Sequence, residues 1–129
     1  MFIRRENFKQ YISLYPVVST LLAINLIVYL ITLIPGLGDE VFWRGIHING
    51  LIDQGEWWRI VTSMFLHGGF THVLFNMFSL FIFGPELEHF TGKVRFLTIY
   101  FLSGIIGNLA TFMIEDSTYA SVGASGAIF

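Results

Sequence analysis

Three polar side chains have types and a spacing that suit nucleophilic chemistry. Ser125 lies between Gly123 and Gly126, where small neighbours leave room for another backbone to approach the hydroxyl. His72 and Asn76 are four residues apart, so both project from one face of a helix. An oxyanion beside Ser125 can accept hydrogen bonds from the backbone N–H of that serine and from these two side chains. The pattern therefore predicts a serine nucleophile with an oxyanion-binding pair.

Each motif also has a purely structural interpretation. Small residues around a serine are common where membrane helices pack closely. A histidine and an asparagine at this spacing can instead form hydrogen bonds between helices. His67 precedes His72 by five residues, a spacing that does not place both on one helix face, so no metal site is expected. The other two histidines, His47 and His89, are expected in solvated loops.

The composition is that of a membrane protein. Of the 129 residues, 54% are hydrophobic and only 12% are charged, whereas soluble domains carry roughly 25% charged residues. Mean hydropathy is +0.68. A net charge of −2 gives no signal for nucleic-acid binding, and the absence of cysteine excludes disulfides and thiol catalysis within this sequence. The expected fold class is an all-α membrane protein.

Three apolar segments are candidates for transmembrane helices. The first, residues 17–34, is uncharged and has a proline at each border; a signal peptide is the alternative, but no small-x-small cleavage site follows it. The second covers about residues 71–83 and is expected to end at Gly84-Pro85. The third covers about residues 96–114. The last residues, 121–129, resemble the opening of a fourth helix.

Basic residues predict how these helices are oriented, because cytoplasmic loops are enriched in Lys and Arg. Arg4, Arg5 and Lys9 precede the first span, and Lys93 and Arg95 lie between the second and third. By alternation these five of the seven basic residues share one side. The N-terminal segment 1–15 is therefore predicted to be cytoplasmic and the loop 35–63 to be outside. The same alternation brings His72, Asn76 and Ser125 to a similar depth near the outer surface.

The loop 35–63 is unusually apolar for an aqueous linker. It contains Trp43, Trp57 and Trp58, and tryptophan is enriched at the membrane–water boundary. We expect the loop to be partly embedded in the outer interface and packed on the helices. The alternative is a small extracellular cap with the tryptophans in its own core.

Together, these motifs resemble the rhomboid family of intramembrane serine proteases. The resemblance runs from about residue 57 to the end, and the first span fits in position. The residues that carry it are Trp58-Arg59, His67, His72-x-x-x-Asn76, Gly84-x-x-x-Glu88-x-x-x-Gly92 and Gly123-Ala124-Ser125-Gly126.

The resemblance implies a six-helix bundle, of which residues 16–129 would form about three and a half helices. It implies that Ser125 is the nucleophile and that His72 and Asn76, with the Ser125 backbone, form the oxyanion hole. Arg59 and Glu88 would be structural, through hydrogen bonds that stabilise loops. Substrates would be transmembrane proteins, and the location a multi-pass position in the plasma (cytoplasmic) membrane. The resemblance implies no metal, cofactor or nucleic acid.

One part of the family's machinery has no match in this sequence. In the family the general base is a histidine on the sixth helix, whereas the sequence ends at Phe129 in the expected fourth helix. A serine without its base is a weak nucleophile, so the 129 residues alone are expected to be inactive. The alternatives are a non-catalytic rhomboid-like protein that binds membrane clients and a small transporter or channel subunit. Retention of Ser125, His72 and Asn76 favours the protease.

Overall fold

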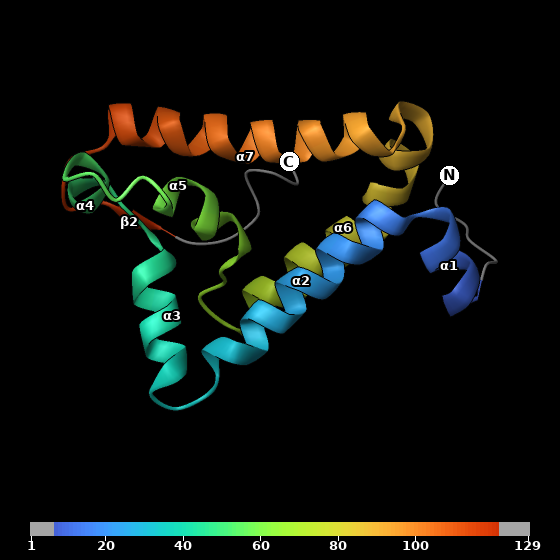
Figure 1. Ribbon diagram of the computed structural model, residues 1–129, viewed down its shortest axis with the longest axis horizontal. Coiled ribbons are helices and arrows are strands. Elements are labelled where there is room, and N and C mark those ends of the chain that lie inside the picture. Colours follow the sequence, from blue (N-terminus) through green and yellow to red (C-terminus); the bar gives the residue numbers. More distant parts are fainter. Residues whose placement is uncertain (1–6, 122–129) are drawn as a thin grey trace.

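The computed structural model describes residues 7–121 and is largely helical, as the sequence predicts. The expected start of a fourth helix, with Gly123, Ser125 and Gly126, lies outside the described residues. Figure 1 shows α2 and α6 side by side, with α7 at an angle to the pair and nearest to it at the turn from α6. The long helices and the short helix before them are α1 (Phe8–Leu14), α2 (Pro16–Thr32), α6 (Phe70–Thr91) and α7 (Lys93–Ile114).

The segment between α2 and α6 is folded. Its elements, with the strand that pairs with it, are α3 (Leu37–Gly45), β1 (His47–Ile48), α4 (Asn49–Asp53), α5 (Arg59–Thr62), the 3-10 helix η1 (Ser63–Phe65) and β2 (Ala120–Ser121). The residues Trp43, Trp57 and Trp58 are 59%, 54% and 53% exposed. They do not form a core of the loop, so the alternative of a self-contained cap built around them is wrong.

The core lies where α2 and α6 face each other. Val18 and Leu21 of α2 pack against Val73, Met77 and Leu80 of α6 in one buried cluster. The two helices approach closely at Gly84, where an added Cβ would lie 2.9 Å from a methyl group of Val18. Any side chain at this position would therefore push α2 away from α6.

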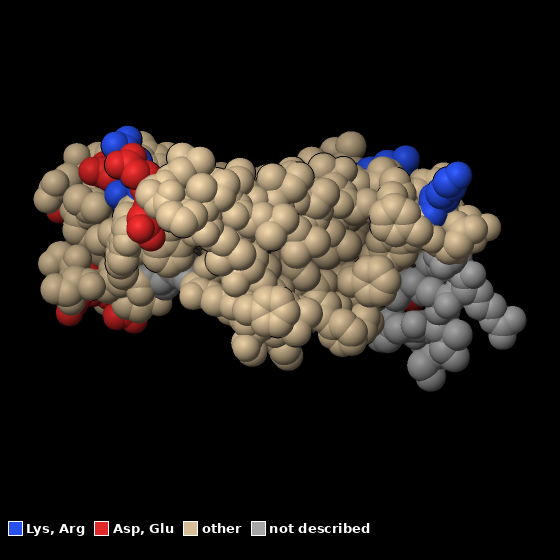
Figure 2. Space-filling model, turned by 90° about the horizontal axis from the view of Figure 1, so that it is seen from below, with Lys and Arg blue, Asp and Glu red and all other residues tan. Residues whose placement is uncertain are grey.

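Among residues 7–121, two helices, α6 and α7, are long and apolar enough to cross a membrane, and α1 with α2 would count as a third span if this pair, bent by 110°, were one. The 17 residues of α2 extend roughly 26 Å at 1.5 Å per residue, slightly less than a bilayer core of about 30 Å. Figure 2 shows an uncharged band between two ends where charged side chains gather. This distribution is that of a protein whose middle lies in lipid.

The second span does not end at Gly84-Pro85 as predicted, because α6 continues through both residues to Thr91. Proline has no N–H and therefore leaves the carbonyl four residues earlier, that of Phe81, without its helical donor. The hydroxyl of Tyr11 in α1 donates to this carbonyl at 3.0 Å, and the two rings stack with centroids 4.9 Å apart. Neighbouring groups commonly compensate for proline in membrane helices in this way.

The turn between α6 and α7 is short and depends on glycine. Gly92 has φ of 87°, which L side chains rarely adopt, and it caps both helices. The third span begins at Lys93 and not near Phe96 as expected. Charged residues fit the first turn of this helix because it lies at the end of the apolar band, where long basic side chains reach water.

Removing the hydroxyl of Tyr11 tests its role in α6. The substitution Tyr11→Phe keeps the stacked ring but leaves the Phe81 carbonyl unbonded. We expect the free energy of unfolding in detergent micelles to fall by about 1 kcal/mol. Tyr29→Phe is the matched control, since that hydroxyl makes no hydrogen bond to a described residue, and it should change the value by less than about 0.5 kcal/mol. Equal effects of the two substitutions would contradict the assignment.

Candidate functional site

His72 and Asn76 lie in the first turns of α6, on the helix face that turns toward the protein interior. Asn76 is 1% exposed and His72 is half-buried. Their neighbours Val73 and Met77 belong to the core cluster, so the packing against α2 fixes the orientation of this face. The side-chain Nδ2 of Asn76 is buried and has no hydrogen-bond partner within the described chain. A donor amide thus remains available beside a histidine on the adjoining helical turn.

His67 contacts this pair, although its spacing from His72 does not place the two residues on one helix face. It precedes α6 on an irregular connector, so helix-face arguments do not apply to it, and its ring meets that of His72 edge to face with centroids 5.2 Å apart. His67 is 2% exposed and neither ring nitrogen has a partner among residues 7–121. Burial, and secondarily the nearby His72, lower the pKa of His67 to about 4, so the ring is neutral at pH 7. No group of three metal-ligating side chains occurs in the described part of the chain.

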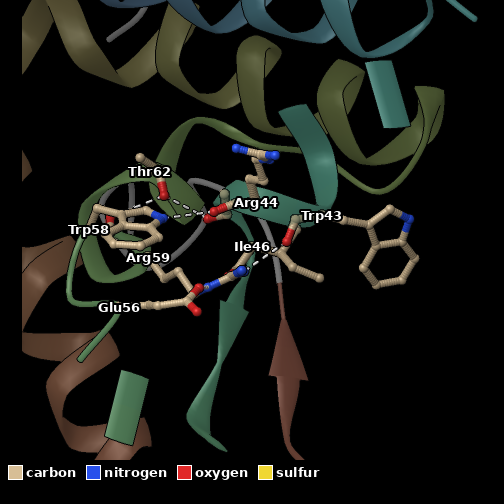
Figure 3. A network of polar contacts seen from close by, with 8 residues as sticks. Trp43, Arg44, Ile46, Glu56, Trp58, Arg59 and Thr62 are labelled. Carbon is tan, nitrogen blue, oxygen red and sulfur yellow. Dashed lines mark hydrogen bonds and ion pairs between the residues drawn. The ribbon is translucent and has the colours of Figure 1, made fainter. Parts of the chain in front are cut away.

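Arg59 organises the loop that precedes this site (Figure 3). Its side chain is 5% exposed. The Nη1 group donates to the carbonyls of Trp43 and Ile46 at 2.8 and 2.9 Å, and Nε donates to Glu56 at 2.9 Å. A planar guanidinium can serve several acceptors at fixed angles, which a lysine cannot. Arg59 therefore connects the end of α3 and the start of β1 to α5.

Trp58 and Thr62 extend the same network (Figure 3). The indole Nε1 of Trp58 donates to the carbonyl of Arg44 at 2.9 Å, and the hydroxyl of Thr62 donates to that of Gly45 at 2.7 Å. Four successive carbonyls at the end of α3, from Trp43 to Ile46, are thus bonded by side chains of one short segment. The side chains of Trp58 and Arg59 therefore fix the loop through hydrogen bonds to its backbone carbonyls.

Glu88 bonds to a helix start and not to a loop. Its two carboxylate oxygens accept the backbone N–H groups of Val18 at 2.9 Å and Val17 at 3.3 Å, in the first turn of α2. Unbonded N–H groups and the helix dipole both favour an anion there. Gly84 lies one turn earlier in α6, against the same Val18. In this series, Gly84 allows the close approach of α2, Glu88 caps the start of α2, and Gly92 ends α6.

Several polar positions differ from the sequence-based expectation. His47 is fully buried and not solvated, with Nε2 hydrogen-bonded to Oδ1 of Asn49. His89 is exposed, but it lies in α6 and not in a loop. Asn108 of α7 was expected only to allow close helix packing, whereas its amide donates to the carbonyl of Ile60 at 2.7 Å and to the hydroxyl of Ser63 at 3.1 Å. A polar residue inside an apolar span was the available signal.

Apolar helices long enough to cross a bilayer, with a small number of buried polar side chains, define an integral membrane protein of the helical class. The family model of the Rhomboid domain matches residues 54–129. The chain belongs to the rhomboid family.

Curated relatives of the chain come from bacteria and eukaryotes. It is 49% identical over 133 residues to the Bacillus subtilis (strain 168) protein named "Putative rhomboid protease YdcA", covering 100% of this chain and 65% of the relative. It is 49% identical over 81 residues to the rhomboid protease GluP of the same organism, covering 63% of this chain and 16% of the relative. It is 35% identical over 125 residues to rhomboid-like protease 1 of Toxoplasma gondii, covering 91% and 42%. The chain therefore spans about two thirds or less of the length of these relatives.

Replacing Arg59 by lysine tests whether the forked hydrogen bonds hold the loop. Arg59→Lys retains the charge but cannot serve Trp43, Ile46 and Glu56 together. We expect the free energy of unfolding to fall by about 2 kcal/mol. The matched control is Arg44→Lys in the same loop, whose side chain is 78% exposed and forms an ion pair with the exposed Glu40. That change should stay within about 0.5 kcal/mol of the parent, and a loss as large as that of Arg59→Lys would refute the distinction.

Proposed function

We propose that the protein is an intramembrane serine endopeptidase that cleaves transmembrane proteins. Ser125 is the nucleophile, and the oxyanion hole consists of its backbone N–H with the side chains of His72 and Asn76. Membership of the rhomboid family and relatives named as proteases support the reaction class. Ser125 lies outside the described residues, so its role rests on the motif of residues 123–126.

The observation that carries the proposal is the unbonded amide of Asn76. Leaving a buried donor without a partner costs about 1–3 kcal/mol. The residue is 1% exposed and its Nδ2 finds no acceptor in residues 7–121. An oxyanion forms only during the reaction, and it would accept the hydrogen bond that this donor lacks in the free protein. A donor of this kind typically contributes about 3 kcal/mol to the transition state.

The proposed general base is a histidine outside these 129 residues. Among the described histidines, His67 and His47 are buried, His89 is exposed at the far end of α6, and His72 is assigned to the oxyanion. The family resemblance places the base on a sixth helix. The complete protein is therefore the active species in this proposal, and no cofactor takes part.

We propose that the N-terminal segment 1–15 is cytoplasmic and that the site faces the opposite side. Lys93 and Arg95 begin α7 at the turn from α6, and Figure 1 shows α1 near that same end of the molecule. The elements α3, α4 and α5 lie at the other end, where α7 finishes. Cytoplasmic ends are the ones enriched in basic residues. The site at the start of α6 would thus open to the outside.

Loss of the nucleophile separates proteolysis from client binding. In the complete protein, Ser125→Ala is expected to abolish cleavage of a transmembrane substrate in liposomes while leaving binding of that substrate within about twofold. Cleavage is followed on gels and binding by co-purification. Cleavage that survives the substitution would show that Ser125 is not the nucleophile. A parent protein that binds such substrates without ever cutting them would favour the client-binding function.

Loss of the oxyanion donor should slow the reaction without unfolding the protein. Asn76→Ala is expected to lower kcat by about 100- to 1,000-fold, while labelling of Ser125 by a fluorophosphonate probe is partly retained. Asn108→Ala is the matched comparison, because that amide has two partners to lose. It should lower the free energy of unfolding more than Asn76→Ala does. Equal activity of Asn76→Ala and the parent would remove the oxyanion role.

A further inference from the structure

The loop after the first span makes direct contact with the segment that leads to Ser125. The strands β1 and β2 pair in antiparallel fashion, with His47 facing Ser121 and Ile48 facing Ala120. The backbone N–H groups of the next two residues continue the contact, since Asn49 donates to Tyr119 and Gly50 to Ser117, both at 3.1 Å. In the sequence, Ser125 follows Ser121 by four positions.

The side chain of Asn49 adds a second attachment. Its amide donates to the carbonyls of Glu115 at 3.1 Å and Thr111 at 3.4 Å, at the C-terminal end of α7. Carbonyls at a helix end need such external donors. The Oδ1 atom of Asn49 meanwhile pairs with Nε2 of His47, whose ring packs edge to face on Tyr119. Asn49 is 3% exposed and His47 is fully buried, so water does not compete at these contacts.

Gly50 lets the two segments approach this closely. A Cβ atom at this position would lie 2.9 Å from the carbonyl oxygen of Ser117 and 3.6 Å from its Cβ. The nearest obstacle is a backbone atom, which cannot rotate away as a side chain can. A larger residue at position 50 must therefore displace the connector between α7 and β2.

The other side of this contact is fixed by Arg59. The carbonyl of Ile46, directly before β1, accepts from the buried guanidinium at 2.9 Å. A continuous set of hydrogen bonds thus runs from α5 through β1 to β2. The residues His47 to Gly50, which we call the clamp, hold the end of α7 and the strand that precedes the nucleophile motif.

We propose that the clamp positions Ser125 for catalysis, with Asn49 and Gly50 as positioning residues that do not touch the substrate. This inference rests on the proposed protease function. A nucleophile must stand within a narrow range of the scissile carbonyl and of the oxyanion donors, and a misplacement of about 1 Å can cost about 100-fold in rate. His72 and Asn76 are carried by α6, whereas Ser125 is reached through α7 and β2. The clamp connects α7 and β2, which lead to Ser125, to the loop that precedes α6.

The first test substitutes the two positioning residues in the complete protein. Gly50→Ala and Asn49→Ala are expected to lower kcat, and the rate of fluorophosphonate labelling, by about tenfold or more, with KM within about twofold. Gly107→Ala is the matched control, a glycine of α7 with no described atom within 4 Å of an added Cβ, and it should retain the parent kcat. A kcat within about twofold of the parent in both clamp variants would overturn the proposal.

A second test restores the clamp covalently and does not depend on how well Gly50→Ala folds. Facing residues of an antiparallel pair have Cα atoms about 4.5–5.5 Å apart, a separation that a disulfide can bridge. The 129 residues contain no cysteine. In the Asn49→Ala background, Ile48→Cys with Ala120→Cys is expected to recover most of the parent kcat when oxidised and to lose it again on reduction. Ile48→Cys alone should not respond.

The outcomes separate this proposal from the proposed function. A disulfide that forms without raising kcat would show that the connector is not what limits the variant, and would overturn the clamp. If the parent and Ser125→Ala proteins are equally inactive, the protease function itself fails. If the parent cleaves and both clamp variants cleave as fast, only the clamp fails.

Discussion

Backbone groups that lie away from water need internal partners, and this requirement determines much of the structure. Regular helices meet it within themselves, but their ends and interruptions do not. The described chain supplies the missing partners from distant side chains. Glu88 bonds the first N–H groups of α2, Tyr11 bonds the carbonyl freed by Pro85, and Arg59 bonds carbonyls at the C-terminal end of α3. Each of these contacts joins two segments, so satisfying the backbone also fixes the tertiary arrangement.

The requirement explains why a small number of polar residues can order so apolar a chain. Burial of apolar side chains is not directional, and in lipid it distinguishes poorly between one helix arrangement and another. Hydrogen bonds specify register, because a donor that moves by one turn loses its acceptor. Asn108 fixes α7 against α5 and η1 in this way, and Asn49 fixes the C-terminal end of α7. The glycines set the distance between elements, because a side chain at Gly84 would collide with Val18 and one at Gly104 would collide with Met64.

Sequence patterns predict the local features of this fold and miss those that depend on a remote partner. Apolar length and composition are local properties, so the long apolar helices and the all-α class follow from them. The continuation of α6 through Pro85 does not, because its donor, Tyr11, is 70 residues away from Phe81. Strands of two residues carry no periodic signal, so the pairing of β1 with β2 and the burial of His47 are invisible in the sequence. The meeting of His67 with His72 also escapes helix-spacing rules, since only one of them is in α6.

The treatment of Asn76 differs from that of two asparagines that bond across elements, the buried Asn49 and the half-buried Asn108. Asn49 and Asn108 each direct Nδ2 to two acceptors on other elements, whereas the Nδ2 of Asn76 has none among residues 7–121. A chain that satisfies distant carbonyls elsewhere has the means to satisfy this donor too. Sequences that follow the rules of polar satisfaction throughout a fold tend to break them at functional sites, where the cost is recovered in another state. An unbonded amide held on a packed helix face is such an exception. The packing of Val73 and Met77 fixes that face. Under the proposed function, the donor would therefore need no reorganisation when an oxyanion forms, which is the property that makes a preorganised dipole effective in stabilising developing charge.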